Sequence, residues 1–230
     1  MNSGKTKKYA QIVTEDSKIA MINLLMSGKF HTVNELANAA KIKSHTASYH
    51  LKNMLALEIL SMEKHGRFHY YKLIDEEFAA FYESVCGIVP PEPIRYLSKK
   101  NESEKLTAAR TCYDHLAGKL GVTITKYLVE NGYLVCSSKS AKLTDDGIKF
   151  LEAKGIDLVS LEQKKRNFCS VCLDWSEREY HISGSVGHAI YQLFVNNEWI
   201  LKDDYTRAVM ITDKGFADLE KHWKLKLKNY

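Results

Sequence analysis

The sequence contains only three prolines among its 230 residues, and all three lie between positions 90 and 93. No apolar run approaches the ~20 residues that a membrane-spanning helix requires, so a membrane partner is not expected. The first eight residues are basic, but a polar and charged stretch, Gln11 to Lys18, follows where a signal peptide would have its apolar core. We therefore predict a cytoplasmic protein.

Cysteine is absent from the first 85 residues, and the total of five is an odd number that does not suit a secreted disulfide framework. The sequence also has no glycine-rich phosphate loop, no Gly-x-Ser-x-Gly elbow and no His-Glu-x-x-His zinc helix. Cys112 and His115, at helical spacing, are the one suggestive nucleophile and base. We do not expect an enzyme, and a cysteine-dependent activity is kept as an alternative.

Positive charge is concentrated at one end of the chain. Residues 1–75 hold 11 Lys and Arg against 6 Asp and Glu, whereas residues 76–230 hold 22 of each kind. Lys and Arg side chains displace the counterions condensed on phosphate, so a basic terminal segment favours a double-stranded DNA partner. The composition therefore indicates a DNA-binding protein with a neutral second half.

Residues 32–72 have the pattern of a helix, a tight turn, a second helix and a two-stranded wing. Thr32 and Glu35 match a capping box at the start of the first helix. We expect Ser44 to cap the second helix, whose inward apolar face is Ala47, Leu51, Met54 and Leu55. His65-Gly66 is expected to form a short turn between two strand-like runs. With helices expected over 14–27 and 75–87, we predict a winged helix-turn-helix domain over residues 1–87.

In a winged helix the second helix of the motif enters the major groove, and the wing reaches the backbone or the minor groove. His50 lies on the inner flank, where we expect a packed and hydrogen-bonded histidine. The candidate DNA-binding residues are the polar and basic side chains of the outward face, the turn and the wing: Lys43, Ser44, His45, Thr46, Ser48, Tyr49, Lys52, Lys64, His65 and Arg67.

Residues 14–87, with Glu35-Leu-Ala and Thr46-Ala-Ser-Tyr-His-Leu51, resemble the winged-helix domain of ArsR-type bacterial repressors. The resemblance implies a homodimer, or a higher oligomer, that binds an inverted-repeat operator and leaves it when an effector binds. It also implies dimer contacts from the helices at 14–27 and 75–87. Metal sensors of that family carry a Cys-x-Cys pair where this chain has Asn38-Ala-Ala, so that thiolate site is excluded.

The proline-rich residues 88–103 are a candidate linker, followed by a C-terminal domain over 104–230. That domain repeats itself: Cys112-Tyr-Asp114 and His115-x-x-Gly118-x-x-Gly121 are echoed by Cys172-Leu-Asp174 and His181-x-x-Gly184-x-x-Gly187, with six extra residues before His181. We predict two related helix-strand-strand-helix units, over 104–155 and 168–223. The fold class is expected to be mainly α with small β wings (α+β).

The second half also contains candidate effector residues. Cys169 and Cys172 form a CxxC pair near Arg166 and Arg178, and nearby cations lower a thiol pKa. Cys112 could join these two thiols in a cluster if the repeat brings the two units together. Separately, an arginine and a carboxylate within residues 174–178 could bind the carboxylate and ammonium groups of an amino acid. The runs 110–115 and 172–178 resemble an extension in a subset of ArsR-like regulators. We hypothesise a sensor of a small thiol metabolite or redox signal through Cys112, Cys169, Cys172, Arg110, Asp174, Trp175 and Arg178.

Alternatives remain open at this stage. The cysteines could be small buried hydrophobes, and residues 174–178 could form a structural salt bridge beside a core tryptophan. No second CxxC pair exists, so neither a metal nor a cofactor is expected. The whole chain could also be an architectural DNA-binding protein without an effector.

Overall fold

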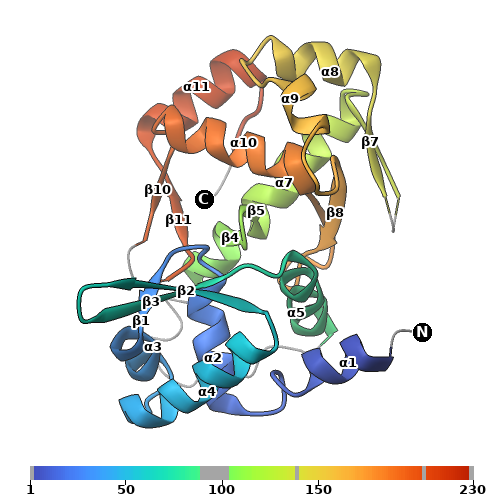
Figure 1. Ribbon diagram of the computed structural model, residues 1–230. Coiled ribbons are helices and arrows are strands. Elements are labelled where there is room, and N and C mark those ends of the chain that lie inside the picture. Colours follow the sequence, from blue (N-terminus) through green and yellow to red (C-terminus); the bar gives the residue numbers. More distant parts are fainter. Residues whose placement is uncertain (1–2, 89–103, 138–139, 204–205, 228–230) are drawn as a thin grey trace. The chain divides into compact units, whose positions relative to one another are not determined.

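The structure is a computed structural model that describes residues 3–88, 104–137, 140–203 and 206–227 (Figure 1). Two compact units divide the chain, Met1–Tyr82 and Glu83–Tyr230. The division falls inside helix α5 (Glu76–Ile88), a few residues before the predicted boundary. Glu83, which begins the second unit, is buried and pairs with Arg207 of the same unit. Most of the predicted linker, residues 89–103, lies outside the described residues.

The first unit has a helix, a turn, a second helix and a hairpin in the predicted order. Its sheet has the antiparallel order β1-β3-β2, with His65 opposite Phe68, so Gly66-Arg67 rather than His65-Gly66 forms the turn. The elements before α5 are α1 (Ser3–Ala10), α2 (Asp16–Leu25), β1 (His31–Thr32), α3 (Val33–Ala39), α4 (Ser44–Ala56), β2 (Leu60–His65) and β3 (Phe68–Leu73).

Local capping explains where α3 and α4 begin. The Thr32 hydroxyl accepts a hydrogen bond from the Glu35 backbone N–H (3.3 Å), and Glu35 accepts one from the Thr32 N–H (2.7 Å), which confirms the capping box. Ser44 was expected to cap α4, but Lys43 holds the N-cap position and the Ser44 hydroxyl donates to Asn34 instead (2.8 Å). Ala47, Leu51 and Met54 of α4 are buried as predicted, whereas Leu55, also expected on the inward face, is half-buried.

Helix α1 was not predicted, because its residues are polar and basic without a clear apolar period. It is anchored by Tyr9, which packs edge-on against Phe78 (5.2 Å between ring centroids) and donates its hydroxyl to both oxygens of Asp75 (3.0 and 2.8 Å). Asp75 also accepts from the Phe78 N–H at the start of α5 (3.0 Å). One carboxylate therefore connects the two ends of the first unit.

We predict that Tyr9→Phe lowers the free energy of unfolding of the first unit by about 1 kcal/mol, because the ring packing is kept and only the hydrogen bond is lost. Tyr9→Ala also removes the buried ring and should cost about 3–5 kcal/mol. Urea unfolding followed by far-UV circular dichroism measures both. Equal losses from the two variants would contradict this division between ring and hydroxyl.

The second unit repeats one order of elements twice: a hairpin, a long helix, a second hairpin and a closing helix. The leading hairpin of each copy was not part of the predicted helix-strand-strand-helix unit. The first copy is β4 (Arg110–Cys112), β5 (His115–Ala117), α7 (Gly118–Glu130), β6 (Leu134–Cys136), β7 (Ala141–Leu143) and α8 (Asp145–Glu152). After α9 (Leu158–Glu162), the second is β8 (Ser170–Leu173), β9 (Tyr180–Ser183), α10 (Gly184–Asn196), β10 (Ile200–Lys202), β11 (Val209–Ile211) and α11 (Asp213–Trp223).

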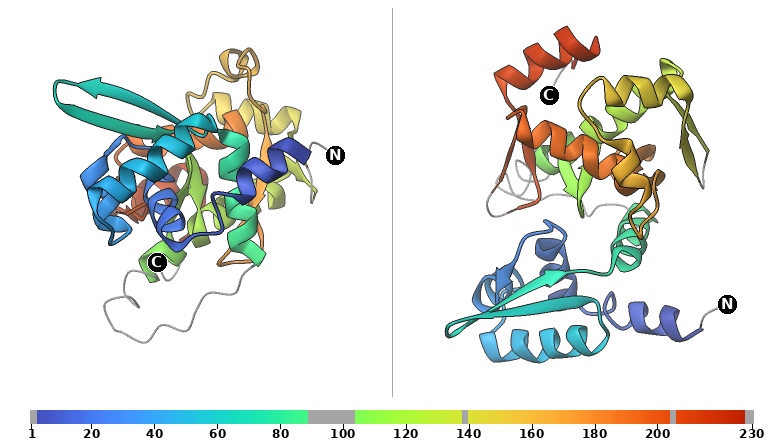
Figure 2. Two further views of the ribbon diagram at one scale, coloured as in Figure 1. Left: turned by 60° about the horizontal axis from the view of Figure 1, so that its bottom comes forward. Right: turned by 45° about the horizontal axis from the view of Figure 1, so that its top comes forward.

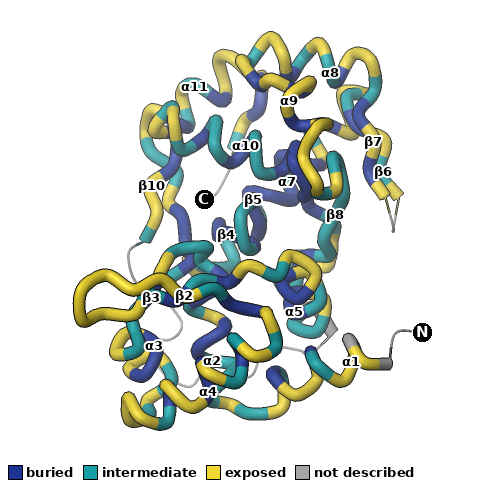
Figure 3. Tube along the Cα trace, in the orientation of Figure 1, coloured by how far each residue is buried: buried dark blue, intermediate teal, exposed yellow. Residues whose placement is uncertain are grey.

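The two copies share a single hydrophobic core. Strand β9 packs against α7, and β5 packs against α10, so each leading hairpin lies on the long helix of the other copy. Figure 3 shows the resulting buried segments of β5 and α7 in dark blue, and Figure 2 gives two further views of the ribbon. Trp223 is fully buried and contacts Phe150, Phe194 and Trp199 edge-on. Within the described residues, no helix has the length and apolar character needed to cross a bilayer.

Candidate nucleic-acid interface and cysteine–histidine cluster

The outward face of α4 is polar and accessible. Ala47, Leu51 and Met54 point into the first unit, which leaves the opposite side of the helix to solvent. Tyr49 is the most informative residue there, because a tyrosine with 63% of its surface exposed gains nothing from the core. The predicted DNA-binding residues of this face are exposed or, for Thr46, half-buried: Lys43, Ser44, His45, Thr46, Ser48, Tyr49 and Lys52.

The hairpin β2–β3 presents the remaining candidates. Lys64, His65 and Arg67 are all exposed, and Arg67 lies over the ring of Phe68 at 5.1 Å. His65 is 3.1 Å from Glu63, which neutralises part of the charge at the tip. Lys64 and Arg67 are therefore exposed positive charges at the tip of this hairpin.

His50 of α4 is buried and points away from the outward face of that helix. Its Nε2 lies 3.2 Å from the Ser17 hydroxyl and 3.0 Å from a Glu15 carboxylate oxygen. These contacts confirm the expectation of a packed, hydrogen-bonded histidine. His50 attaches α4 to the start of α2 and does not reach the outward face.

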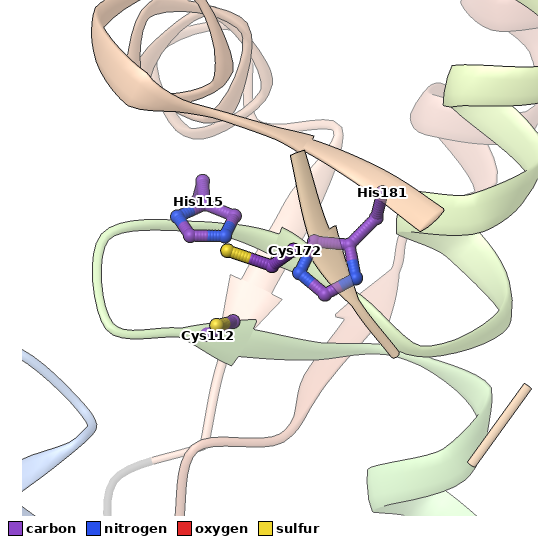
Figure 4. Close-up of side chains that lie close together, drawn as sticks. All are labelled: Cys112, His115, Cys172 and His181. Carbon is purple, nitrogen blue, oxygen red and sulfur yellow. The ribbon is translucent and has the colours of Figure 1, made fainter. Parts of the chain in front are cut away.

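A second site lies in the second unit, where two cysteines and two histidines meet. Cys112 and His115 are directly opposite each other on the hairpin β4–β5, and Cys172 and His181 are opposite each other on β8–β9. Opposite residues of an antiparallel pair point to the same face. Each copy thus contributes one thiol and one imidazole, and one ligand atom from each of the four residues lies within 4.8 Å of the others. Figure 4 shows the four side chains turned toward one another.

Two glycines allow the hairpins to approach so closely. A Cβ on Gly121 of α7 would lie 2.4 Å from the Leu116 carbonyl oxygen and 3.4 Å from the Cβ of His181. A Cβ on Gly187 of α10 would meet Ile182 at 2.7 Å and the Cβ of His115 at 3.4 Å. Each glycine therefore lets the histidine of the other copy pack against its helix, in addition to allowing the helix to contact its own strand.

Each histidine of the cluster faces a carboxylate through Nδ1. The Nδ1 of His115 is 3.4 Å from Asp114, which is held by Arg166 at 2.6 Å. The Nδ1 of His181 is 3.2 Å from Asp174, an ion-pair distance without hydrogen-bond alignment. The Nε2 atoms of both rings are buried and have no hydrogen-bond partner outside the cluster among the described residues.

The charges in the cluster are strongly coupled. A hydrogen bond from Cys112, together with the charge on His115, holds the pKa of the Cys172 thiol well below its ordinary value despite burial. Burial and the bond to Cys172 raise the pKa of Cys112 well above its ordinary value. Burial opposes a charge on His115, but the negative charge on Cys172 and the hydrogen bond with Asp114 raise its pKa to about 9. Cys172 is therefore the more acidic thiol of the pair.

Comparison with known proteins places the chain in a family. It is 39% identical over 220 residues to the uncharacterized HTH-type transcriptional regulator YdfF of Bacillus subtilis (strain 168), across 96% of this chain and 97% of that protein. This chain belongs to the HTH-type transcriptional regulators. No protein-family model matches it. Among solved structures, the AntR antimony-specific transcriptional repressor is similar at 18% identity and a TM-score of 0.34, over 45% of this chain and 83% of that one. A likeness that weak supports no conclusion about function.

In this regulator, several predicted effector residues lie outside the cluster. Cys169 is half-buried against the hydrophobic core, and burial raises its pKa to about 12. Arg110 and Asp174 are fully buried and pair with each other at 2.9 Å, with Trp175 stacked 4.3 Å from the guanidinium. Arg178 is exposed. These contacts match the structural salt bridge and correct the expectation of an open amino-acid clamp, because the two charges already neutralise each other.

The regulator's cluster contains residues that the candidate effector set omitted, namely His115 and His181 with their partners Asp114 and Arg166. His115 matches His181 in the internal repeat, and Asp114 matches Asp174, as Cys112 matches Cys172. The repeat was therefore the available signal. The CxxC spacing was the misleading one, since it selected Cys169.

Proposed function

We propose that the regulator is a repressor of the ArsR type that acts in the cytoplasm, with α4 in the major groove of its operator and β2–β3 as the wing. The observation that carries the proposal is the outward face of α4, which combines an exposed Tyr49 with hydroxyls and Lys52, opposite the buried Ala47, Leu51 and Met54. Hydroxyl and phenol groups suit base edges and phosphates, whereas lysine supplies charge without base information.

The proposal includes a homodimer on an inverted-repeat operator. Two recognition helices one turn of DNA apart would read the two half-sites. Helices α2 and α5 flank the motif and are the proposed source of the dimer contacts. Analytical ultracentrifugation of the full chain tests this part, and a monomer that still binds the operator with full affinity would contradict it.

Two matched variants test how α4 divides its work. Tyr49→Ala should reduce the preference for operator over random duplex, by about 1–3 kcal/mol if the phenol contacts a base edge. Lys52→Ala should weaken binding to both duplexes alike and reduce the salt slope by about one. Fluorescence anisotropy at several salt concentrations measures both quantities, and equal effects of the two variants on both duplexes would refute the assignment.

We further propose that Cys112 and Cys172 make the second unit responsive to a thiol or redox signal. Cys172 is the more acidic thiol and hydrogen bonds with Cys112, so hydrogen peroxide can oxidise the pair: two thiols give one disulfide, and the hydrogen peroxide is reduced to two water molecules.

Cys112→Ser/Cys172→Ser should abolish the effect of peroxide or a small disulfide on operator binding. Cys169→Ser, which changes a half-buried thiol outside the cluster, should leave this response intact. Operator binding measured before and after oxidation provides the readout. An unchanged response in the double variant would overturn this part of the proposal.

A further inference from the structure

We propose that Cys112, His115, Cys172 and His181 bind a zinc-class divalent ion in a tetrahedral site of two thiolates and two imidazoles. Each copy of the repeat contributes one cysteine and one histidine, so the ion joins the two copies at their shared centre. Binding of the ion does not depend on the DNA-binding function proposed above. The inference adds a ligand to the same cluster.

The geometry of the four residues suits such an ion. A tetrahedral zinc with bonds of about 2.0 Å to nitrogen and 2.3 Å to sulfur places its ligand atoms roughly 3.3–3.8 Å apart. The four atoms already lie within 4.8 Å of one another, so side-chain rotations that close the cluster by about 1 Å suffice. The cross-strand pairing of each hairpin places its cysteine and histidine on one face.

The buried histidine nitrogens provide independent support. The Nε2 atoms of His115 and His181 have no hydrogen-bond partner outside the cluster among the described residues, and both rings are almost fully buried. Buried polar atoms without a partner are rare and usually mark an ion, a water or a functional group. A metal bonded to both Nε2 atoms satisfies them at once, and the thiol groups supply the two remaining ligands.

The surrounding carboxylates complete the pattern. Metal-binding histidines usually donate their other ring N–H to a carboxylate, which fixes the ring and raises its basicity. Here Nδ1 of His115 faces Asp114 and Nδ1 of His181 faces Asp174. The two aspartates are in turn held by Arg166 and Arg110. The same arginine–aspartate–histidine chain therefore occurs on both sides of the cluster.

The donor set selects the class of ion. Two sulfur and two nitrogen ligands in a tetrahedral arrangement favour zinc, whereas calcium and magnesium take oxygen ligands. All four positions are filled by protein and three of the four residues are buried, which is typical of a structural site and not of a catalytic one with an open position. Cys172, the fourth ligand, is half-buried.

The direct test uses the full chain, purified under reducing conditions, stripped with a chelator and reloaded with zinc or cobalt. Elemental analysis should find about one ion per chain. Cobalt should give the strong visible bands of a tetrahedral ion and a near-ultraviolet thiolate-to-cobalt band. Failure of the stripped chain to take up zinc, or a weak octahedral cobalt spectrum, would overturn the site.

Matched cysteine variants locate the ion. Cys172→Ser should remove zinc binding and the thiolate-to-cobalt band from that sulfur, while Cys169→Ser, three residues away, should leave both unchanged. If the first variant loses native circular dichroism, Asp114→Asn decides the matter. That variant keeps all four ligands, and it should weaken zinc affinity by about 10–100-fold because it releases the His115 ring.

Three results would contradict the inference: zinc retained by a folded Cys112→Ser/Cys172→Ser variant, equal zinc loss from Cys169→Ser and Cys172→Ser, or unchanged zinc affinity in Asp114→Asn. Operator binding is measured on the same zinc-loaded samples, and its presence or absence is a result independent of zinc binding. A chain that holds zinc in this site but binds no DNA would defeat the proposed repressor and leave the metal site standing.

Discussion

Asp174→Asn is expected to lower the free energy of unfolding of the second unit by about 3–5 kcal/mol, because it leaves the buried Arg110 guanidinium without a counter-charge. Both side chains have no exposed surface and lie 2.9 Å apart. The Asp174 carboxylate also accepts the Gly118 N–H at 2.7 Å and the Ser176 hydroxyl at 2.8 Å. The asparagine amide has only one oxygen that accepts hydrogen bonds. Its NH2 group would face the guanidinium, N–H or hydroxyl donors that the carboxylate now accepts.

The control for this variant is an exposed ion pair on the same loop. Glu179 pairs with Lys126 at 2.7 Å, but half of each side chain is exposed, so Glu179→Gln should cost at most about 1 kcal/mol. All three tryptophans, including Trp175 beside Arg110, lie in the second unit. Urea unfolding followed by tryptophan fluorescence therefore reports this unit, and similar losses from the two variants would contradict the assigned role of Asp174.

Leu51→Ala should destabilise the first unit by about 2–5 kcal/mol, whereas Tyr49→Ala, two positions away, should change its stability by no more than about 0.5 kcal/mol. Leu51 is fully buried on the inner face of α4, and Tyr49 is on the outer face. Operator binding should show the reverse order. Under conditions in which Leu51→Ala is still folded, it should bind the operator almost normally, whereas Tyr49→Ala should bind it more weakly.

Because the first unit has no tryptophan, far-UV circular dichroism follows its unfolding while tryptophan fluorescence stays constant. The two probes separate loss of the first unit from loss of the second. A large stability loss in Tyr49→Ala would mean that its ring serves packing, and the assignment of this face to DNA would then be unsupported.

The sequence predicted the first unit well because its signals are local. The capping box at Thr32, the apolar period of α4 and the alternation of the hairpin each lie within a few residues of their cause. Helix α1 escaped prediction since its anchor is the distant contact between Tyr9 and Asp75, 66 positions apart. Ser44 was misplaced by one residue, because a nearby acceptor on Asn34 draws its hydroxyl away from the cap.

The cluster in the second unit was only half predicted. A CxxC pair suggests two thiols on one side, as in a turn or helix, but β8 begins at Ser170 and the chain is extended there. Cys172 lies on that strand, whereas Cys169 lies in the bend before it and packs against the hydrophobic core, so the two thiols separate. His115 lies opposite Cys112, and His181 lies opposite Cys172. This register depends on hairpin pairing, which the spacing of residues along the chain does not reveal.

The most direct test of the central claim is selection of duplexes from a random DNA library by the full chain, followed by anisotropy titration of the best duplex and a scrambled one at stated salt. We expect an inverted repeat that binds at least about 10³-fold tighter than the scrambled duplex. Affinity should fall linearly with salt on logarithmic axes. Equal affinity for both duplexes would indicate an architectural protein, and no binding to either would contradict the assignment of α4 to DNA.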